Sequence, residues 1–224
     1  MLRGIFVTGT DTNVGKTVVS AALMIRYRDE APLTYWKPVQ TGIEHDDDSR
    51  EVARLAGVAG REAIYDRGVR LAHPVSPHLA ARLAGTRITV RSLVEQLNGD
   101  ADGDARWVVE GAGGVLVPIN ERETMADLIA ALDLPVLIAA RSTLGTINHT
   151  LMTIEALRSR MLRVAGVVMV GEPNDENRLA IEKYGAAEVI GEMPRFDPLT
   201  PDALERWVRT AFDRHGVLFV GGLR

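Results

Sequence analysis

A glycine-rich segment near the amino terminus, Gly9–Thr17 (GTDTNVGKT), has the composition of a phosphate-binding loop and leads directly into an apolar helical run. In such loops, backbone N–H groups and the helix amino terminus bind phosphate oxygens. The lysine reaches the terminal phosphates, and the hydroxyl that follows it binds Mg²⁺. Five residues separate Gly9 from Gly15, one more than in the usual pattern. We predict that Lys16 binds the β- and γ-phosphates of a nucleoside triphosphate and that Thr17 binds Mg²⁺.

Two acidic features stand in segments that we expect beside this loop. Glu110 closes the apolar run 106–110 and is followed by glycines, and Asp46–Asp48 precede a helical pattern. Carboxylates beside a triphosphate repel it unless a hard cation lies between them, and Mg²⁺ prefers such oxygen ligands. For the Asp run alone, a solvated loop with a helix cap at Asp48 or Ser49 is the simpler interpretation. An acid at the end of a buried strand has little structural use, so metal binding is favoured for Glu110.

A lysine opens the segment Lys37–Gly42 (KPVQTG), directly after the apolar run Leu33–Trp36. Pro38 restricts the residue before it to extended conformations, so the Lys37 ammonium is expected to point from the sheet edge. A fixed cation in that place could neutralise charge that develops on a transferred phosphoryl group. A surface lysine in a turn is the alternative interpretation.

Short apolar runs that alternate with longer helical patterns indicate how these residues are positioned. The expected strands are Gly4–Thr8, Leu33–Trp36, Arg106–Glu110, Pro135–Ala140, Val164–Val170 and Glu188–Ile190. The expected helices are Lys16–Arg28, Ser49–Ala56, Pro77–Ala84, Val90–Leu97, Met125–Leu132, Ile147–Met161, Glu176–Tyr184 and Pro201–Arg214. Continuous apolar strands are typical of a sheet that is covered on both faces. We therefore predict a single α/β domain over residues 1–224, of the P-loop nucleoside triphosphatase type. It has a mostly parallel central sheet with helices on both faces, and Asn98–Ala105 form a surface loop.

Composition excludes several other classes of function. The net charge is −4 and no run of Lys and Arg occurs, which argues against a nucleic-acid partner. The chain has no cysteine, so disulfides, thiolate metal sites and cysteine nucleophiles are all excluded. No apolar stretch approaches the roughly 18 residues of a membrane span, and the first residues do not form a signal peptide. We expect a cytoplasmic protein with no membrane partner.

The motifs together resemble those of the dethiobiotin synthetase family. The matching features occur in the family's order over roughly residues 5 to 196. They are GTDTNVGKT, KPVQTG, the Asp run before a helix, SPH (Ser76–His78), EGAGG (Glu110–Gly114) and GTINHT (Gly145–Thr150). GTDTxVGKT together with KPVxTG and EGAGG is specific to this family, whereas GKT alone is not.

The resemblance implies a reaction that consumes ATP and requires Mg²⁺. One amine of 7,8-diaminopelargonic acid takes up CO₂ as a carbamate, and ATP phosphorylates that carbamate. The second amine then closes a cyclic urea, and ADP and phosphate leave. Positioning and electrostatics carry phosphoryl transfer, so no amino-acid nucleophile is needed.

The resemblance also assigns residues, with Lys16 and Lys37 as the catalytic pair and Thr17, Asp48 and Glu110 as the metal ligands. The nucleotide-binding residues it implies are Asn13, Val14, Gly15, Lys16, Thr17, Val18, Asp48, Glu110, Gly111, Ala112, Gly113, Val170, Gly171, Pro194, Arg195 and Phe196. The substrate-binding residues are Thr12, Lys37, Thr41, Gly145, Thr146, Ile147 and Asn148. Family members are homodimers in which the GTINHT segment of one subunit faces the substrate of the other. Without the resemblance to this family, the start of a capped helix is an equally good interpretation of Gly145–Asn148.

The chain departs from the family at one place. Members that read adenine can carry Asn-Asp after the strand that matches Val164–Val170, whereas this chain has Val170-Gly171. A missing side-chain amide removes the penalty that a wrong base would otherwise meet. We therefore expect weak discrimination between nucleobases.

Two other classes of protein share parts of the pattern. Amide ligases of the cobyrinic acid synthase type usually carry a glutaminase domain with a cysteine nucleophile, and this chain has neither a cysteine nor room for that domain. Partition and septum-placement ATPases carry an additional lysine near the start of the phosphate loop, where this chain has Thr10 and Asp11. Both interpretations are weaker than the dethiobiotin synthetase one.

Overall fold

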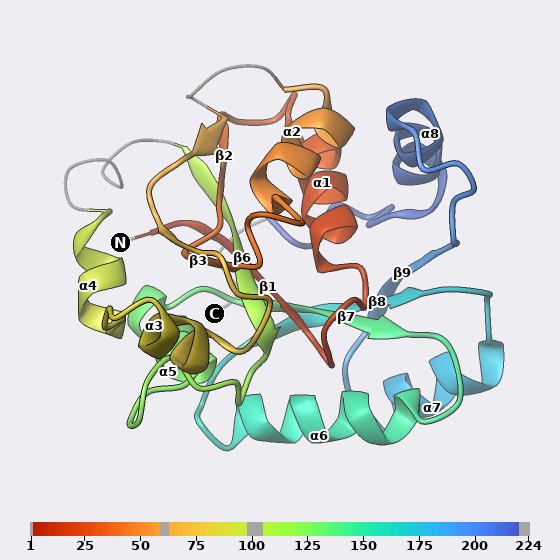
Figure 1. Cartoon of the computed structure of the whole chain (residues 1–224). Helices are drawn as coiled ribbons and strands as arrows, with labels where there is room; N and C mark the ends of the chain where they lie inside the picture. Colours follow the sequence, from red (N-terminus) through yellow and green to blue (C-terminus); the bar gives the residue numbers. More distant parts are fainter. Residues whose placement is uncertain (1, 59–62, 98–104, 220–224) are drawn as a thin grey trace.

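The computed structural model describes residues 2–58, 63–97 and 105–219, and its centre is a seven-stranded sheet. The strands lie in the order β4-β2-β6-β1-β7-β8-β9, and all their pairings are parallel. They are β1 (Gly4–Gly9), β2 (Leu33–Trp36), β4 (Ile64–Tyr65), β6 (Arg106–Gly114), β7 (Val136–Arg141), β8 (Val164–Val170) and β9 (Val189–Met193). The predicted parallel sheet is confirmed, with β1 between β6 and β7 (Figure 1).

Helices cover both faces of the sheet, as predicted (Figure 1). One apolar cluster joins the sheet to α1 (Lys16–Tyr27), α2 (Asp48–Ala56) and α8 (Pro201–Ala211). A second cluster, on the opposite face, includes α3 (Pro77–Leu83), α4 (Val90–Glu95), α5 (Met125–Leu132), α6 (Thr146–Arg158) and α7 (Asp175–Gly185). Each helix expected from the sequence is present, with ends that differ by a few residues because terminal turns carry little apolar signal.

Three short strands were not predicted. They are β4 and the two strands of a separate parallel ladder, β3 (Val39–Thr41) and β5 (Val69–Leu71). Each is two or three residues long, which is too short for an alternating pattern to be recognised. The ladder lies directly after Lys37 and so fixes the segment that carries it. The polar stretch expected to form a surface loop falls, apart from Ala105, outside the described residues.

Strand β6 is longer than predicted, and this changes the setting of Glu110. The sequence suggested that the strand ends there, but pairing continues to Gly114, which lies opposite Gly9 after a shift in register. Glycines permit this close approach, because a methyl group on Gly111 would lie only 2.9 Å from Cε1 of Phe6. Glu110 therefore lies inside a strand that accompanies β1 into the phosphate loop.

Alternation along β6 decides which way Glu110 points. Val108 belongs to the cluster under α1, and Val109 belongs to the cluster on the opposite face. Side chains two residues apart share a face of a sheet, so Glu110 points toward α1. Its exposed fraction is 0%.

A second buried acid, Asp213, follows α8 and lies against the far end of α1. The Asp213 carboxylate accepts hydrogen bonds from the Tyr27 hydroxyl and from the backbone N–H groups of Val217 (2.9 Å) and Leu218 (3.3 Å). Burial is the main cause that raises the pKa of the Tyr27 hydroxyl, and the neighbouring Asp213 raises it further. The hydroxyl therefore stays protonated. This contact holds the segment after α8 against α1, about 15 Å along the helix axis from Thr17.

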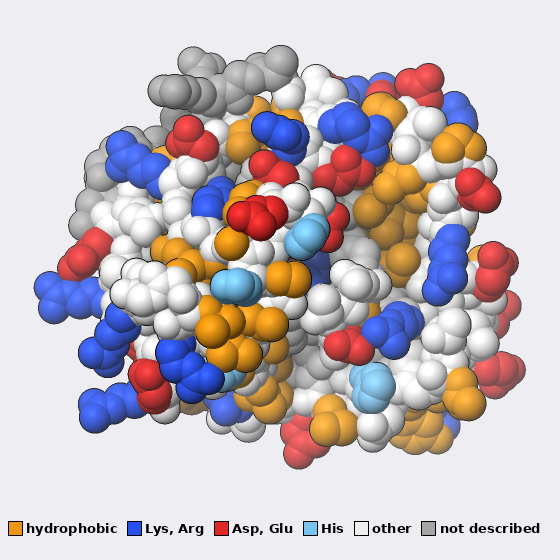
Figure 2. Space-filling model, viewed as in Figure 1, with side chains coloured by type: hydrophobic (Ala, Val, Ile, Leu, Met, Phe, Trp, Pro, Cys, Tyr) orange, Lys and Arg blue, Asp and Glu red, His pale blue; other side chains and the backbone are white. Residues whose placement is uncertain are grey.

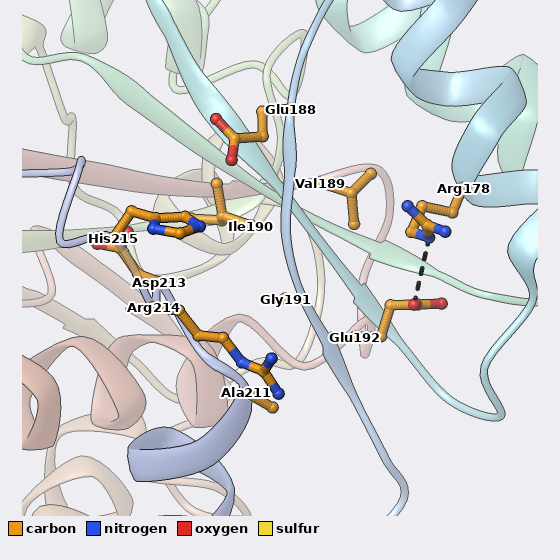
Figure 3. A pocket seen from close by; sticks show the side chains of 10 residues that line it. All are labelled: Arg178, Glu188, Val189, Ile190, Gly191, Glu192, Ala211, Asp213, Arg214 and His215. Atoms are coloured by element: carbon orange, nitrogen blue, oxygen red, sulfur yellow. Dashed lines mark ion pairs between the residues drawn. The ribbon is translucent and has the colours of Figure 1, made fainter.

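A cavity of about 480 Å³ lies beside β9 at the edge of the sheet, and its lining includes residues of α7, of β9 and of the segment after α8 (Figure 3). Its walls include Arg178 and Glu192, which form an ion pair of 3.5 Å. Arg178 also pairs with Asp175 (3.3 Å) and Glu182 (3.5 Å). These charges are matched within the protein, and they hold α7 against β9.

Among the described residues, no helix is both long and apolar enough to cross a membrane. On the face of the molecule shown in Figure 2, basic and acidic side chains are interspersed.

Candidate functional site

The predicted site residues gather at one edge of the sheet. The phosphate loop follows β1, Lys37 follows β2 and Glu110 lies in β6. Val170-Gly171 stand at the end of β8, and Pro194–Phe196 follow β9. Because the strands are parallel, their carboxyl ends meet at the same edge, which is where ligands bind in sheets of this type.

The phosphate loop is built on left-handed backbone. Gly15 has φ 95° and Asn13 has φ 57°, conformations that turn the chain sharply into α1. No side chain caps the first turn of α1, so its amino terminus can receive an anion. A methyl group on Gly15 would lie 3.2 Å from Cγ1 of Val170, so the end of β8 supports the loop.

The predicted phosphate-binding lysine lies along this loop. Lys16 Nζ donates a hydrogen bond to the Asp11 carbonyl oxygen at 3.1 Å, and its side chain is buried. Burial, with a contribution from the Lys37 charge, lowers the pKa of Lys16. The Glu110, Asp48 and Asp11 carboxylates act in the opposite direction but do not outweigh burial.

Lys37 is buried rather than exposed, so the alternative of a surface lysine is wrong. Its exposed fraction is 3%, and Nζ lies 2.6 Å from Oδ2 of Asp48 and 2.8 Å from Oε1 of Glu110. Nζ also donates to the carbonyl oxygen of Gly111 at 3.1 Å. Burial by itself would lower the pKa of Lys37, but the two carboxylates outweigh it and raise the pKa. Lys37 therefore keeps its positive charge in the interior.

Three oxygens converge beside this ammonium. Thr17 Oγ1 lies 3.0 Å from Oδ1 of Asp48 and 3.1 Å from Oε1 of Glu110. A hydroxyl has one proton, so it can satisfy only one of these carboxylate oxygens at a time. Burial would raise the pKa of Asp48, but Lys37 and Thr17 lower it, so the carboxylate is ionised at neutral pH. The arrangement fits a hard cation that is shared by the three oxygens.

The same site lacks a complete set of protein ligands for a metal. Among residues 2–58, 63–97 and 105–219, no three His, Cys, Asp or Glu side chains gather as a metal-binding group. Mg²⁺ commonly takes one or two carboxylates and completes its coordination with phosphate oxygens and water. The site therefore suits Mg²⁺ that arrives with a nucleotide better than a permanently bound metal.

The Asp run contains both a helix cap and a site residue, but the cap was assigned to the wrong position. Asp47, not Asp48 or Ser49, caps α2 by accepting a hydrogen bond from the Arg50 N–H at 3.1 Å. The Asp48 carboxylate is thereby left for Lys37 and Thr17. Gln40 supports the run, because its amide donates to the Asp46 carbonyl (3.2 Å) and accepts from the Asp48 N–H (3.4 Å).

Two buried hydroxyls at Glu110 were not predicted. Ser20 Oγ and the Tyr35 hydroxyl lie 2.9 Å and 3.0 Å from Oε2 of Glu110. One signal was available, since Ser20 interrupts an otherwise apolar helical run in which every neighbouring position is Val or Ala. No comparable signal exists for Tyr35, because tyrosine is common in buried strands.

The expected substrate residues form a less connected group. Thr12 is exposed on the phosphate loop, where Asp11 pairs with Arg141 at 2.7 Å, and Thr41 lies in β3. Gly145, with φ 93°, begins α6 after β7, next to the fully exposed Leu144. The Asn148 amide donates to Sδ of Met152, so its contact lies within α6 and not with the cluster around Lys37.

The residues expected at the nucleobase offer few free polar side chains. Val170 packs against the phosphate loop, and a methyl group on Gly171 would lie 2.4 Å from Oγ of Ser142. The nearby Asn177 amide donates to the Ser142 carbonyl at 2.8 Å, and Asn174 caps α7. Pro194, Arg195 and Phe196 follow directly on Met193, whose Cε would lie 3.4 Å from a methyl group on Gly15.

Solved structures similar to this chain share its fold. The ParA family ATPase from Chlorobium tepidum superposes with a TM-score of 0.55 at 10% identity, covering 98% of this chain and 94% of that one. A chain of the MinC:MinD cell division protein complex from Aquifex aeolicus has a TM-score of 0.54 at 17% identity, covering 91% and 86%. At these identities the likeness concerns the fold alone.

Sequence comparison is more specific. Residues 3–203 match a family of AAA domains. The ATP-dependent dethiobiotin synthetase of Paramagnetospirillum magneticum is 50% identical over 199 residues, which are 89% of this chain and 91% of that protein. That of Agrobacterium fabrum is 45% identical over 209 residues, 93% and 92% of the two chains. A biotin biosynthesis bifunctional protein of Bordetella avium is 47% identical over 206 residues, 92% of this chain and 42% of that protein. Relatives this similar over nearly the whole chain, together with the phosphate loop and its buried Lys37 cluster, show that the chain belongs to the ATP-dependent dethiobiotin synthetase family.

Proposed function

We propose that this chain is a single-domain, cytoplasmic ligase that acts as a homodimer in biotin synthesis. It converts 7,8-diaminopelargonic acid, CO₂ and ATP to dethiobiotin, ADP and phosphate. The observation that carries the proposal is the buried contact of Lys37 with Asp48 and Glu110 beside the phosphate loop. This contact places a cation and a candidate metal site beside the loop that would bind phosphate.

Residues of the phosphate loop and the buried cluster would bind the triphosphate and its Mg²⁺. Backbone N–H groups of Asn13–Thr17 and the amino terminus of α1 bind phosphate oxygens, and Lys16 leaves the Asp11 carbonyl to reach the β- and γ-phosphates. Thr17, Asp48 and Glu110 would hold Mg²⁺, which offsets the charge of the phosphates. Glu110 and Asp48 would otherwise repel the nucleotide.

Lys37 would act at the reacting centre. One substrate amine adds to CO₂ and loses a proton, and an oxygen of the resulting carbamate takes the γ-phosphoryl group as ADP leaves. The second amine then attacks the carbamoyl carbon, the C–O bond to phosphate breaks, and the cyclic urea forms. Lys37 keeps its charge in the interior, so it can stabilise the anionic carbamate and the transferring phosphoryl group. Thr12 and Thr41 would orient the diamine.

A turnover assay tests this proposal against the other two classes. We expect ADP release that depends on both diamine and bicarbonate, with dethiobiotin detected by mass spectrometry. ATP hydrolysis that proceeds equally with nucleotide alone would instead favour a partition-type ATPase. Turnover that requires an amide donor would favour the cobyrinic acid synthase class.

The Lys37→Ala variant should lose turnover by a factor of about 10²–10³, or roughly 3–4 kcal/mol, because it loses a preorganised charge. Removing this ammonium also leaves two buried carboxylates less well compensated. We therefore also expect a lower melting temperature without Mg²⁺, partly restored when Mg²⁺ and nucleotide are added. The exposed Lys183→Ala variant is the control. More than half of wild-type turnover in the Lys37→Ala variant would exclude the assigned role.

The Glu110→Gln and Asp48→Asn variants should each require at least about tenfold more Mg²⁺ for half-maximal activity, since each loses a charged contact to the metal. The measurement is turnover against Mg²⁺ concentration at saturating ATP. The exposed Asp29→Asn variant should give the wild-type curve. Unchanged curves for both site variants would mean that these carboxylates do not bind metal.

Mixing inactive Lys37→Ala and Asn148→Ala proteins should restore activity, if Gly145–Asn148 of one subunit complete the substrate site of the other. A hybrid dimer then contains one site built from unmutated halves. Random mixing makes half of the dimers hybrid, so recovery should reach about a quarter of wild-type turnover. Gly145, Asn148 and their neighbour Leu144 are exposed, which supports this arrangement, whereas Thr146 is buried. Absence of recovery, with hybrid dimers verified by mass spectrometry, would count against a shared site.

GTP and CTP should support turnover within about tenfold of ATP, which corresponds to roughly 1.4 kcal/mol of discrimination. Val170 packs against the phosphate loop, and Pro194–Phe196 can offer stacking and backbone contacts that most bases accept. The measurement is kcat/KM for each triphosphate at saturating diamine and bicarbonate. A preference for ATP above a hundredfold would show that other residues read adenine.

A further inference from the structure

The two oxygens of the Glu110 carboxylate have different surroundings. Oε1 faces Lys37 Nζ (2.8 Å) and Thr17 Oγ1 (3.1 Å), which are the groups at the candidate metal site. Oε2 faces away from them, toward the hydroxyls of Ser20 (2.9 Å) and Tyr35 (3.0 Å). Two hydroxyls therefore bind Oε2 of the carboxylate, and Oε1 is left to contact cations.

We propose that Ser20 and Tyr35 are positioning residues that fix the Glu110 carboxylate with Oε1 toward the metal site, and that they thereby set the affinity for the divalent cation. The inference rests on the proposed metal role of Glu110. It assigns a specific task to two buried hydroxyls that touch neither nucleotide nor substrate in the proposed reaction.

The geometry of the two donors supports this task. The final torsion of a glutamate side chain is broad, so a carboxylate without partners can rotate freely. Here the donors come from different elements, Ser20 from α1 and Tyr35 from β2. Two donors on separate elements define both the position and the plane of the carboxylate. Hydrogen bonds of this kind orient metal-binding carboxylates in proteins generally.

Tyr35 is the stronger of the two constraints. Its side chain is fully buried, and its hydroxyl donates to Glu110 Oε2. The single Ser20 proton is shared with the carbonyl oxygen of Lys16, also at 2.9 Å. The same serine therefore connects Glu110 to the first turn of the phosphate-binding helix.

The chain contains a matched control for Tyr35. Tyr27 is also a buried tyrosine whose hydroxyl donates to a buried carboxylate, that of Asp213, at the opposite end of α1. Tyr27→Phe and Tyr35→Phe thus remove the same atom from the same kind of contact. A general effect on packing or stability should appear in both variants, whereas an effect on metal affinity should appear only at Tyr35.

The experiment measures binding of Mn²⁺ by electron paramagnetic resonance to the full-length protein saturated with adenylyl imidodiphosphate. We expect the dissociation constant for Mn²⁺ to rise about 10- to 100-fold in Tyr35→Phe and several-fold in Ser20→Ala. Tyr27→Phe should bind as wild type does. Turnover of the two site variants should recover at saturating Mg²⁺, because the carboxylate ligand itself is still present.

The outcomes separate this inference from the proposed function. If Glu110→Gln weakens Mn²⁺ binding while Tyr35→Phe and Ser20→Ala do not, the positioning role is wrong and the metal site stands. If Glu110→Gln leaves Mn²⁺ binding unchanged, the metal site is wrong, and the positioning role is wrong with it. Should Tyr35→Phe fail to fold, Ser20→Ala decides the question alone, with unchanged Mn²⁺ affinity overturning the inference.

Discussion

The structure depends on one electrostatic constraint, which is that a fully buried carboxylate must be compensated where it stands. Glu110 has no exposed surface, and it meets that constraint with the Lys37 ammonium and with hydroxyls from Thr17, Ser20 and Tyr35. Burying a charge without such partners costs more free energy than a marginally stable domain can lose. Because the partners come from β2 and from α1, compensating Glu110 also fixes the phosphate loop relative to the neighbouring strand.

The parallel sheet makes this compensation possible. Its strands end at one edge, so β1, β2 and β6 deliver the phosphate loop, Lys37 and Glu110 to the same place. Glycines after Glu110 let β6 continue beside β1. Because side chains alternate between the two faces of a strand, the Glu110 carboxylate points toward α1. The ParA family ATPase and the chain of the MinC:MinD complex share this fold at only 10% and 17% identity, so the likeness to them concerns the fold alone. Activity therefore follows from the residues at this edge and not from the fold that presents them.

The cluster places a positively charged side chain in the same region as the candidate cation-binding site. Lys37 lies between the two carboxylates proposed as metal ligands, so it compensates their charge. A triphosphate that arrives with one Mg²⁺ would still add net negative charge to the site, and Lys16 and Lys37 would offset part of it. In the proposed reaction, Lys37 would stabilise a carbamate or a transferring phosphoryl group. In this view, one buried ammonium both stabilises the fold and takes part in the proposed reaction.

The sequence by itself determined the features that depend on neighbours along the chain. The phosphate loop, the helices and the buried strands β1, β2, β7 and β8 were predicted, because loop glycines and apolar periodicity act over a few residues. Only the tertiary structure decided the partners of Lys37, the continuation of β6 and the short ladder of β3 and β5. It also decided that Asp47, and not Asp48 or Ser49, caps α2. Glu110 meets Lys37 across 73 positions and Thr17 across 93, and local propensity carries no information over such distances. Those contacts exist because the parallel sheet brings the ends of separate strands together.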